Sequence, residues 1–463
     1  MVDAFLFLFT LGLFALGLRR PFIWVLAYIY LDIVAPQKIG WTLMPALPFS
    51  LIAFVAAFAG WLLADSKDGS RFTFRQGLLF ALLVYVTAST VSAAFPEFAW
   101  GKWDWVWKAL VFAIFLPLTL RTKLRIEAAI LFMVLSAAAI IIPGGIKTMA
   151  GGGGYGAQLF LVNDNSGLYE SSTIACVAIA VIPLILWLAK HGTIFPPDWR
   201  VRLFAAALTF SALLIPVGTA TRTGLLCIGV LAMLMLRTVR HRFLYAGLAA
   251  AAVLVALPLL PKSYTERMST IEHHQQDESA STRLAVWNWT LNYAKDHPLG
   301  GGFEAYLANS FSYKRKVEDD SGDVTSIDTV TVTDKGRAFH SAYFEMLGEQ
   351  GWPGLGLWLW LQALGLWQME WVRRRLKKSD DPADRRFRDL ASALENGQVV
   401  YLVGALFIGI AFQPFIFMLI ALQIALWTMV RRRENERRAR SSNRRTAPDQ
   451  PGPPPAIADG TPA

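Results

Sequence analysis

The sequence predicts an all-α polytopic membrane protein with about 12–13 transmembrane helices, and three observations support this. Of the 463 residues, 54% are hydrophobic, and the mean hydropathy is +0.41. Apolar stretches of roughly 15–20 residues, the length that crosses a bilayer, recur along almost the whole chain. The net charge is +10, but the basic residues lie in short clusters between these stretches, as in membrane topology signals rather than a nucleic-acid surface. Strand-like alternation is absent, and backbone groups in lipid must be paired internally, so we expect helices.

The apolar stretches give thirteen candidate spans with one alternating topology. They cover residues 4–18, 22–36, 48–64, 77–95, 105–120, 126–143, 170–189, 203–218, 223–236, 243–260, 340–370, 397–412 and 415–430. Basic clusters mark every second connection, beginning with Arg19-Arg20 and ending with the "RRRENERRAR" tail. Because Lys and Arg concentrate on the cytoplasmic side, we expect the N-terminus outside and the C-terminus inside. Asp3 precedes the first span and Arg19-Arg20 follows it, the reverse of a secretory signal peptide, so we expect this span to be retained.

These spans divide the chain into four parts. They are an N-terminal transmembrane bundle (1–260), a loop domain with short helices (261–339), C-terminal transmembrane helices (340–430) and a basic, Pro-rich cytoplasmic tail (431–463). Within the loop domain, residues 315–336 are charged and poor in apolar side chains, so we expect them to be mobile. We expect the tail to be disordered and to lie near anionic lipid.

Three basic residues on the predicted outer side are candidates for chemistry. Arg222 lies at a span edge, on the side where basic residues are otherwise rare, and either meets lipid headgroups or binds an anion. Arg283 follows a Ser-Thr cap signal and is expected in the first turn of a loop helix. There it is either a solvated side chain or a bidentate partner for phosphate oxygens. His340 opens a span and is either a hydrogen-bonded structural residue or a proton acceptor.

Acidic and amide residues on the same side form a second set of candidates. Glu345 and Glu349 are four residues apart and share a helical face, where they either carry protons or pair with arginines. Asp164 and Asn165 precede a span, so they either cap its helix or bind a sugar. Nearby, Gly348, Gly351 and Gly354 are spaced to line one side of a helix and allow close helix approach.

Neither a metal site nor a cofactor site is expected. His273 and His274 are the histidines nearest to His340 that could share a metal, but no Cys or carboxylate spacing supports such a site. The two cysteines, Cys176 and Cys227, lie inside apolar runs and read as buried apolar residues.

These motifs resemble the O-antigen ligase superfamily. In "HSAYFEMLGEQGWPG", His340-Ser341 is followed by nine residues and then by Gly-x-x-Gly, as in the ligase motif of that family. An Arg before a glycine in a short turn (Arg222) and a loop helix reading Arg…Trp, "HP", "G-x-G" (from Arg283) match as well. The segment "HSAYFEMLGEQG" most resembles the exosortase A-associated putative O-glycosylation ligases, where "DNN" stands in place of the "NDN" around Asp164.

The resemblance implies a GT-C-like membrane glycosyltransferase that needs no metal. Its donor would be a glycan on undecaprenyl pyrophosphate, and its acceptor a hydroxyl of a glycan, lipid or protein at the periplasmic face of the bacterial inner membrane. Arg222 and Arg283 would hold the diphosphate, and His340 would act as general base, with inversion at the sugar carbon. The other expected substrate-binding residues are Ser341, Asp164, Asn165 and Glu345.

Two other functions stay open on the sequence. An O-antigen polymerase would share the fold and the arginines but would use a second lipid-linked glycan as acceptor. A transporter or flippase of lipid-linked sugars, a different class, would also contain many spans and embedded charge. Transporters typically contain inverted repeats and midplane polar sites, whereas this chain contains no evident repeat and gathers its polar residues on one side.

Overall fold

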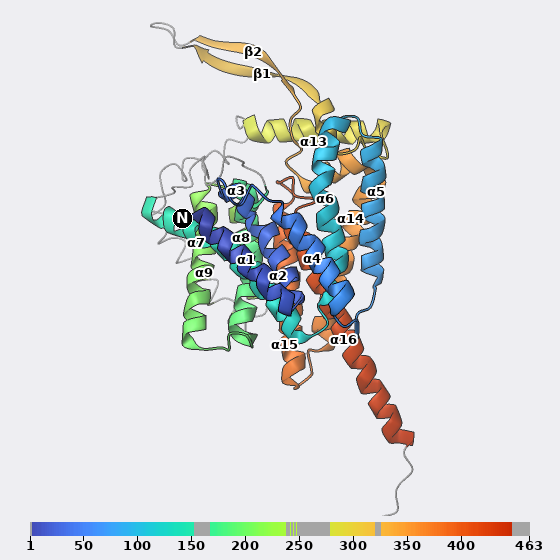
Figure 1. Ribbon diagram of the computed structural model, residues 1–463. Helices are drawn as coiled ribbons and strands as arrows, with labels where there is room; N and C mark the ends of the chain where they lie inside the picture. The colour runs from blue at the N-terminus through green and yellow to red at the C-terminus, as the bar shows by residue number, and fades with distance from the viewer. Residues whose placement is uncertain are drawn as a thin grey trace, which may run out of the picture.

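A computed structural model describes the chain over four ranges and three single residues, namely 2–151, 167–237, 278–319, 326–446, 241, 244 and 247. Asp164, Asn165 and most of the predicted span 243–260 lie outside these residues. Within them, the chain is a bundle of long helices, with another helix lying across one end and a two-stranded ribbon projecting beyond it (Figure 1).

The helices follow the predicted apolar segments. They are α1 (Val2–Arg19), α2 (Phe22–Val34), α3 (Pro36–Ile39), α4 (Phe49–Ala64), α5 (Phe74–Val91), α6 (Pro96–Thr119), α7 (Lys123–Gly151), α8 (Ser171–His191), α9 (Trp199–Gly218), α10 (Arg222–Leu236), α13 (Glu278–Asp296), α14 (Ala342–Arg375), α15 (Pro382–Gly404) and α16 (Pro414–Thr446), with short 3-10 turns at Gly167–Tyr169 and Ala305–Ala308. Among the described helices, six are long and apolar enough to cross a membrane, and α2, α4 and α10 are apolar but shorter. The predicted all-α polytopic membrane fold is confirmed.

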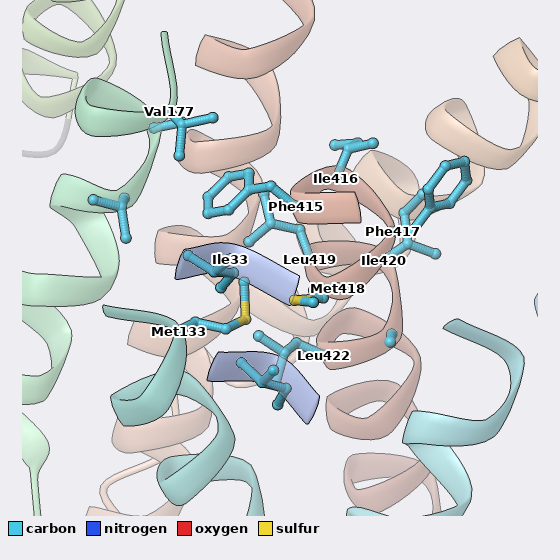
Figure 2. Packing of buried hydrophobic residues seen from close by; sticks show 14 of the residues in the cluster. Ile33, Met133, Val177, Phe415, Ile416, Phe417, Met418, Leu419, Ile420 and Leu422 are labelled. Carbon is cyan, nitrogen blue, oxygen red and sulfur yellow. The ribbon is translucent and has the colours of Figure 1, made fainter. Parts of the chain in front are cut away.

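The core of the bundle is built around the first half of α16. Side chains from Phe415 to Leu426 are nearly all buried around the whole helix, as expected for a helix that is apolar on every face. Figure 2 shows Ile33 of α2, Met133 of α7 and Val177 of α8 pointing towards this helix. The three N-terminal elements are thereby packed against the C-terminal part of the chain, so the two parts share one core.

Two boundaries at the C-terminal end differ from the prediction. The span predicted at 397–412 is a helix only to Gly404, which packs tightly against Cys176, and the next residues leave the helix. Beyond the bilayer segment, α16 continues to Thr446, into the tail predicted to be disordered. Arg433 and Arg437, one turn apart, pair with Asp381 and Asp384 at 2.7–2.9 Å, which holds this extension against the start of α15.

A β-hairpin also differs from the prediction that strands are absent. Strands β1 (Ser310–Asp319) and β2 (Ser326–Lys335) pair antiparallel, with Ser310 opposite Lys335 and Asp319 opposite Ser326. The short alternation "TVTV" at 329–332 is the strand signal, and charged neighbours concealed it. In addition, the loop domain contains the 19-residue helix α13 rather than short helices alone.

Candidate active site

A cavity of about 730 Å³ opens between α2, α6, α8, α13, α14 and the segment after α15. This volume lies in the range of small-molecule sites, roughly 300–1,000 Å³. Four residues singled out in the sequence line it together, namely Arg283, His340, Glu345 and Glu349. The whole lining runs from Tyr28 of α2 to Pro414 of α16, elements far apart along the chain, so the cavity exists only in the folded bundle.

His340 is held at the cavity by anchors on both sides. It has φ 46°, a left-handed conformation that costs a non-glycine residue free energy and recurs at functional sites. Before it, the Phe339 carbonyl accepts a 2.9 Å hydrogen bond from the Trp287 indole. After it, the Ala342 N–H donates to the carbonyl of Ala405 at 2.9 Å. The backbone is therefore clamped where the imidazole opens into the cavity.

The electrostatic surroundings favour a neutral imidazole. Burial, followed by the positive charge of Arg283, lowers the pKa of His340 below its usual 6.5. A neutral imidazole can accept a proton near neutral pH. Arg283 lies in the second turn of α13 rather than in the predicted first turn, because the helix already includes Glu278. The N–H groups of the helix start therefore do not supplement its guanidinium.

A buried ion cluster, which we call the lysine cluster, lies at the same cavity. The Lys102 ammonium is 2.7 Å from Glu345 Oε1, 2.8 Å from Glu349 Oε1 and 4.0 Å from Glu304 Oε1. The second oxygen of Glu345 accepts from the N–H of Ala411 at 3.1 Å. Glu345 and Glu349 thus pair with a lysine, not with the arginines considered above. Lys102 was missed in the sequence, although a lone Lys among tryptophans on the predicted outer side was a usable signal.

The glycine motif after His340 allows the predicted close approach, with Gly348 packed against Phe339 and Thr290, and it also contains a kink. Gly351 has φ 63° and ψ −168° and interrupts α14. A side chain there would place Cβ 2.2 Å from the Pro298 carbonyl oxygen. The N–H of Gly302 donates to the Glu349 carbonyl at 2.9 Å, and the N–H of Trp352 donates to Pro298 at 3.0 Å. The "HPLGGG" loop and the Gly-x-x-Gly motif are therefore one docked unit that fixes the direction of α14 below His340.

Two other predicted residues that the structure describes, Arg222 and Ser341, do not line the cavity. Arg222 begins α10 next to the hydrogen-bonded hydroxyls of Thr219 and Thr221, and it is not among the lining residues. Ser341 is buried as the residue before α14 and does not line the cavity either. The predicted roles of Arg222 and Ser341 stay predictions.

Among the residues that the structure describes, no group of three or more His, Cys, Asp or Glu side chains is arranged to hold a metal ion. Where Glu304, Glu345 and Glu349 converge on the cavity, the Lys102 ammonium occupies the space between them. The positive charge beside these three carboxylates therefore comes from a side chain of the protein, Lys102.

Two family profiles match the chain. Residues 1–193 match a family of unknown function (DUF5935), and residues 204–359 match the O-antigen ligase family (Wzy_C). No curated protein matches. The second match spans Arg222, Arg283, His340 and the kink of α14. It supports the placing of this multi-pass membrane protein in the O-antigen ligase superfamily, with a function of the glycosyl-transfer kind.

Proposed function

We propose that the protein transfers a glycan en bloc from undecaprenyl pyrophosphate to an acceptor hydroxyl, in the manner of the exosortase A-associated O-glycosylation ligases. The observation that carries this proposal is the shared cavity of His340 and Arg283, a neutral proton acceptor and a fixed cation. Transfer to a hydroxyl needs both groups, since one proton must leave the acceptor and one anion must leave the donor.

The proposed reaction is a single displacement. His340 accepts the proton of the acceptor hydroxyl while its oxygen attacks the anomeric carbon. The bond from that carbon to the diphosphate oxygen breaks, and the lipid diphosphate leaves with the electron pair. Arg283 stabilises the departing charge by bidentate hydrogen bonds, which match phosphate oxygens. Attack opposite to the leaving group inverts the anomeric centre. Arg222 is proposed as the second cation for the diphosphate, from the start of α10.

The lysine cluster supports a reaction driven by side-chain cations rather than a divalent metal. Carboxylates that would otherwise attract a divalent ion are already bridged by Lys102 at 2.7 and 2.8 Å. The guanidinium of Arg283 lines the same cavity. A positioned positive charge stabilises a leaving anion most strongly where water is excluded. We therefore propose that transfer is independent of divalent cations.

The proposed location is the periplasmic face of the inner membrane. The connections after α4 and α6 interact with each other and with the basic second half of α16. Asp65 pairs with Arg121 and Arg125, and the main-chain carbonyl of Arg121 accepts from Arg432 of α16. The positive-inside rule assigns these connections to the cytoplasm. In Figure 1 the cavity elements α3 and α13 lie towards the other end of the bundle.

The decisive test is reconstitution of the purified protein in liposomes with an undecaprenyl-pyrophosphate glycan and candidate acceptors. We expect His340→Ala to abolish transfer, whereas His297→Ala retains it, because His297 is exposed and stacks on Tyr293 outside the cavity lining. Transfer should persist in excess EDTA. Near-normal transfer by His340→Ala, or its loss on chelation, would contradict the proposal. A ladder of products from the lipid-linked glycan alone would indicate a polymerase.

A further inference from the structure

A second wall of the cavity, built by α2 and α6, contains polar and aromatic groups that the proposed transfer step does not use. Asp32 lies near the end of α2, and Trp105 and Lys108 lie one turn apart on α6. All three line the cavity that also contains His340. The question is what these groups bind, since none of them is needed for proton or charge transfer.

Asp32 has an incomplete set of hydrogen bonds. Its Oδ2 atom is buried and has no hydrogen-bond partner among the described residues. Buried polar atoms are almost always paired, and an unpaired carboxylate oxygen costs free energy, so an exception calls for a missing donor. The nearby Lys108 does not supply that donor either: its ammonium lies 2.8 Å from Asp104, and Asp32 Oδ2 stays without a partner.

Trp105 indicates what kind of molecule supplies the donor. Its side chain is 42% exposed although it lines the cavity, so an aromatic surface is left open beside the unpaired carboxylate oxygen. The face of an indole carries partial negative charge and attracts the electron-poor C–H groups of a flat ligand. A pyranose ring combines both requirements, since its hydroxyls donate hydrogen bonds around the rim and its C–H groups form an apolar face.

We propose that Asp32 and Trp105 form a subsite for a neutral hexose ring of the glycan. Asp32 Oδ2 accepts a hydrogen bond from a ring hydroxyl, and the ring packs on the Trp105 indole. This inference rests on the proposed function, and it adds that the enzyme holds the sugar chain itself in addition to the diphosphate. The subsite would set which glycan is accepted, whereas His340 and Arg283 carry out the transfer.

The test measures sugar binding without any transfer. Saturation-transfer difference NMR is recorded on the full-length protein in nanodiscs with the methyl glycosides of glucose, galactose, mannose and N-acetylglucosamine. Glycerol, which has hydroxyls but no ring face, is the reference. We expect ring-proton signals for at least one glycoside, and roughly tenfold weaker binding by Asp32→Ala and by Trp105→Ala, the effect of losing one hydrogen bond or one aromatic contact.

Matched controls separate the subsite from folding and from catalysis. Asp296→Ala and Trp352→Ala remove an exposed residue of each type outside the cavity lining and should bind like the wild type. His340→Ala should bind glycosides normally while failing in transfer. Binding unchanged in both subsite variants, or equal signals for glycerol and every glycoside, would overturn the subsite. If the wild type transfers glycan but binds no glycoside through Asp32, only the subsite is wrong; if it binds glycosides but never transfers, the proposed function is wrong.

Discussion

Two buried polar clusters, both anchored on α14, differ in what surrounds them. The lysine cluster faces the cavity. The other, which we call the glutamine seam, consists of Arg75, Gln362, Gln368, Gln398 and Gln423. In the seam, Arg75 donates to Gln423 at 2.9 Å, Gln423 donates to Gln398 at 2.8 Å, and Gln398 donates to Gln362 at 2.7 Å. The side chains of the glutamine seam connect α5, α14, α15 and α16, and all of them lie on regular helical backbone. The lysine cluster, in contrast, lies beside non-helical segments of the chain.

Backbone strain separates the two clusters. The described residues include four non-glycine residues with positive φ, and three of them, Ala35, Glu304 and His340, line the cavity. The fourth, Ala220, lies in the turn before Arg222. Such conformations cost about 1–3 kcal/mol each and persist where the surrounding structure enforces them, typically at functional sites. Buried polarity is therefore common to both clusters, whereas backbone strain and an open cavity distinguish the candidate site.

The largest expected effect comes from breaking the lysine cluster. Lys102→Met leaves Glu349, which is fully buried, without its cation, so we expect about 3–5 kcal/mol of lost stability and loss of transfer. The thermal unfolding midpoint in detergent and the reconstituted transfer rate measure this. Lys108→Met, two turns along α6, breaks a pair with the 66% exposed Asp104 and should cost at most about 1 kcal/mol. Equal midpoints for the two variants would show that the cluster is not a stabilising unit.

The kink in α14 should give the next largest effect. Gly351→Ala must adopt φ 63° and place Cβ against the Pro298 carbonyl, so we expect a loss of about 1–3 kcal/mol and reduced transfer as the "HPLGGG" loop is displaced. Gly356→Ala on the same helix meets nothing within 4 Å and should be neutral or stabilise by up to about 1 kcal/mol. The measurement is the thermal unfolding midpoint of each variant. A Gly351→Ala protein as stable as Gly356→Ala would argue against a docked kink.

A smaller effect, on stability alone, is expected in the glutamine seam. Gln368→Met removes the acceptor that lies 3.2 Å from Arg75 Nη1 and keeps the side-chain volume. Hydrogen bonds to charged groups are worth about 1.5–3 kcal/mol. This one is long, so its loss should cost about 1.5 kcal/mol, the lower end, and leave the transfer rate of the folded protein unchanged. A selective loss of transfer without a lower unfolding midpoint would mean that the seam also serves the reaction, and the distinction between the two clusters would fail.

The fold was largely predictable because each apolar helix is encoded locally. The predicted span 170–189, for example, is α8 (Ser171–His191). The hairpin was missed because charged neighbours concealed its short alternation, and the continuation of α16 was missed because pairing with distant residues decides it. Arg433 and Arg437 are held by Asp381 and Asp384, and no pattern within the tail encodes that contact.

The candidate site was predictable only where its residues form a motif. His340 and Arg283 stand in recognisable spacings, and the cavity brings them together. Lys102 and Asp32 were missed, since Lys102 meets Glu345 across 243 residues of sequence and Asp32 is notable only for an atom left without a partner. The kink at Gly351 was missed because three-residue spacing alone cannot reveal a positive φ.

The smallest expected effect is a shift in pH dependence, and it probes the cavity electrostatics directly. The neutral form of His340 is the proposed base, so kcat/KM should fall as pH drops through the pKa of His340, which lies below 6.5. Arg337 lowers this pKa and Glu170 raises it. Replacing either residue by an uncharged one should therefore shift the acid limb of the kcat/KM–pH profile, in opposite directions for the two residues. Arg337→Gln should shift it to higher pH and Glu170→Gln to lower pH. Shifts of the same sign, or none, would mean that the limb reports a group other than His340.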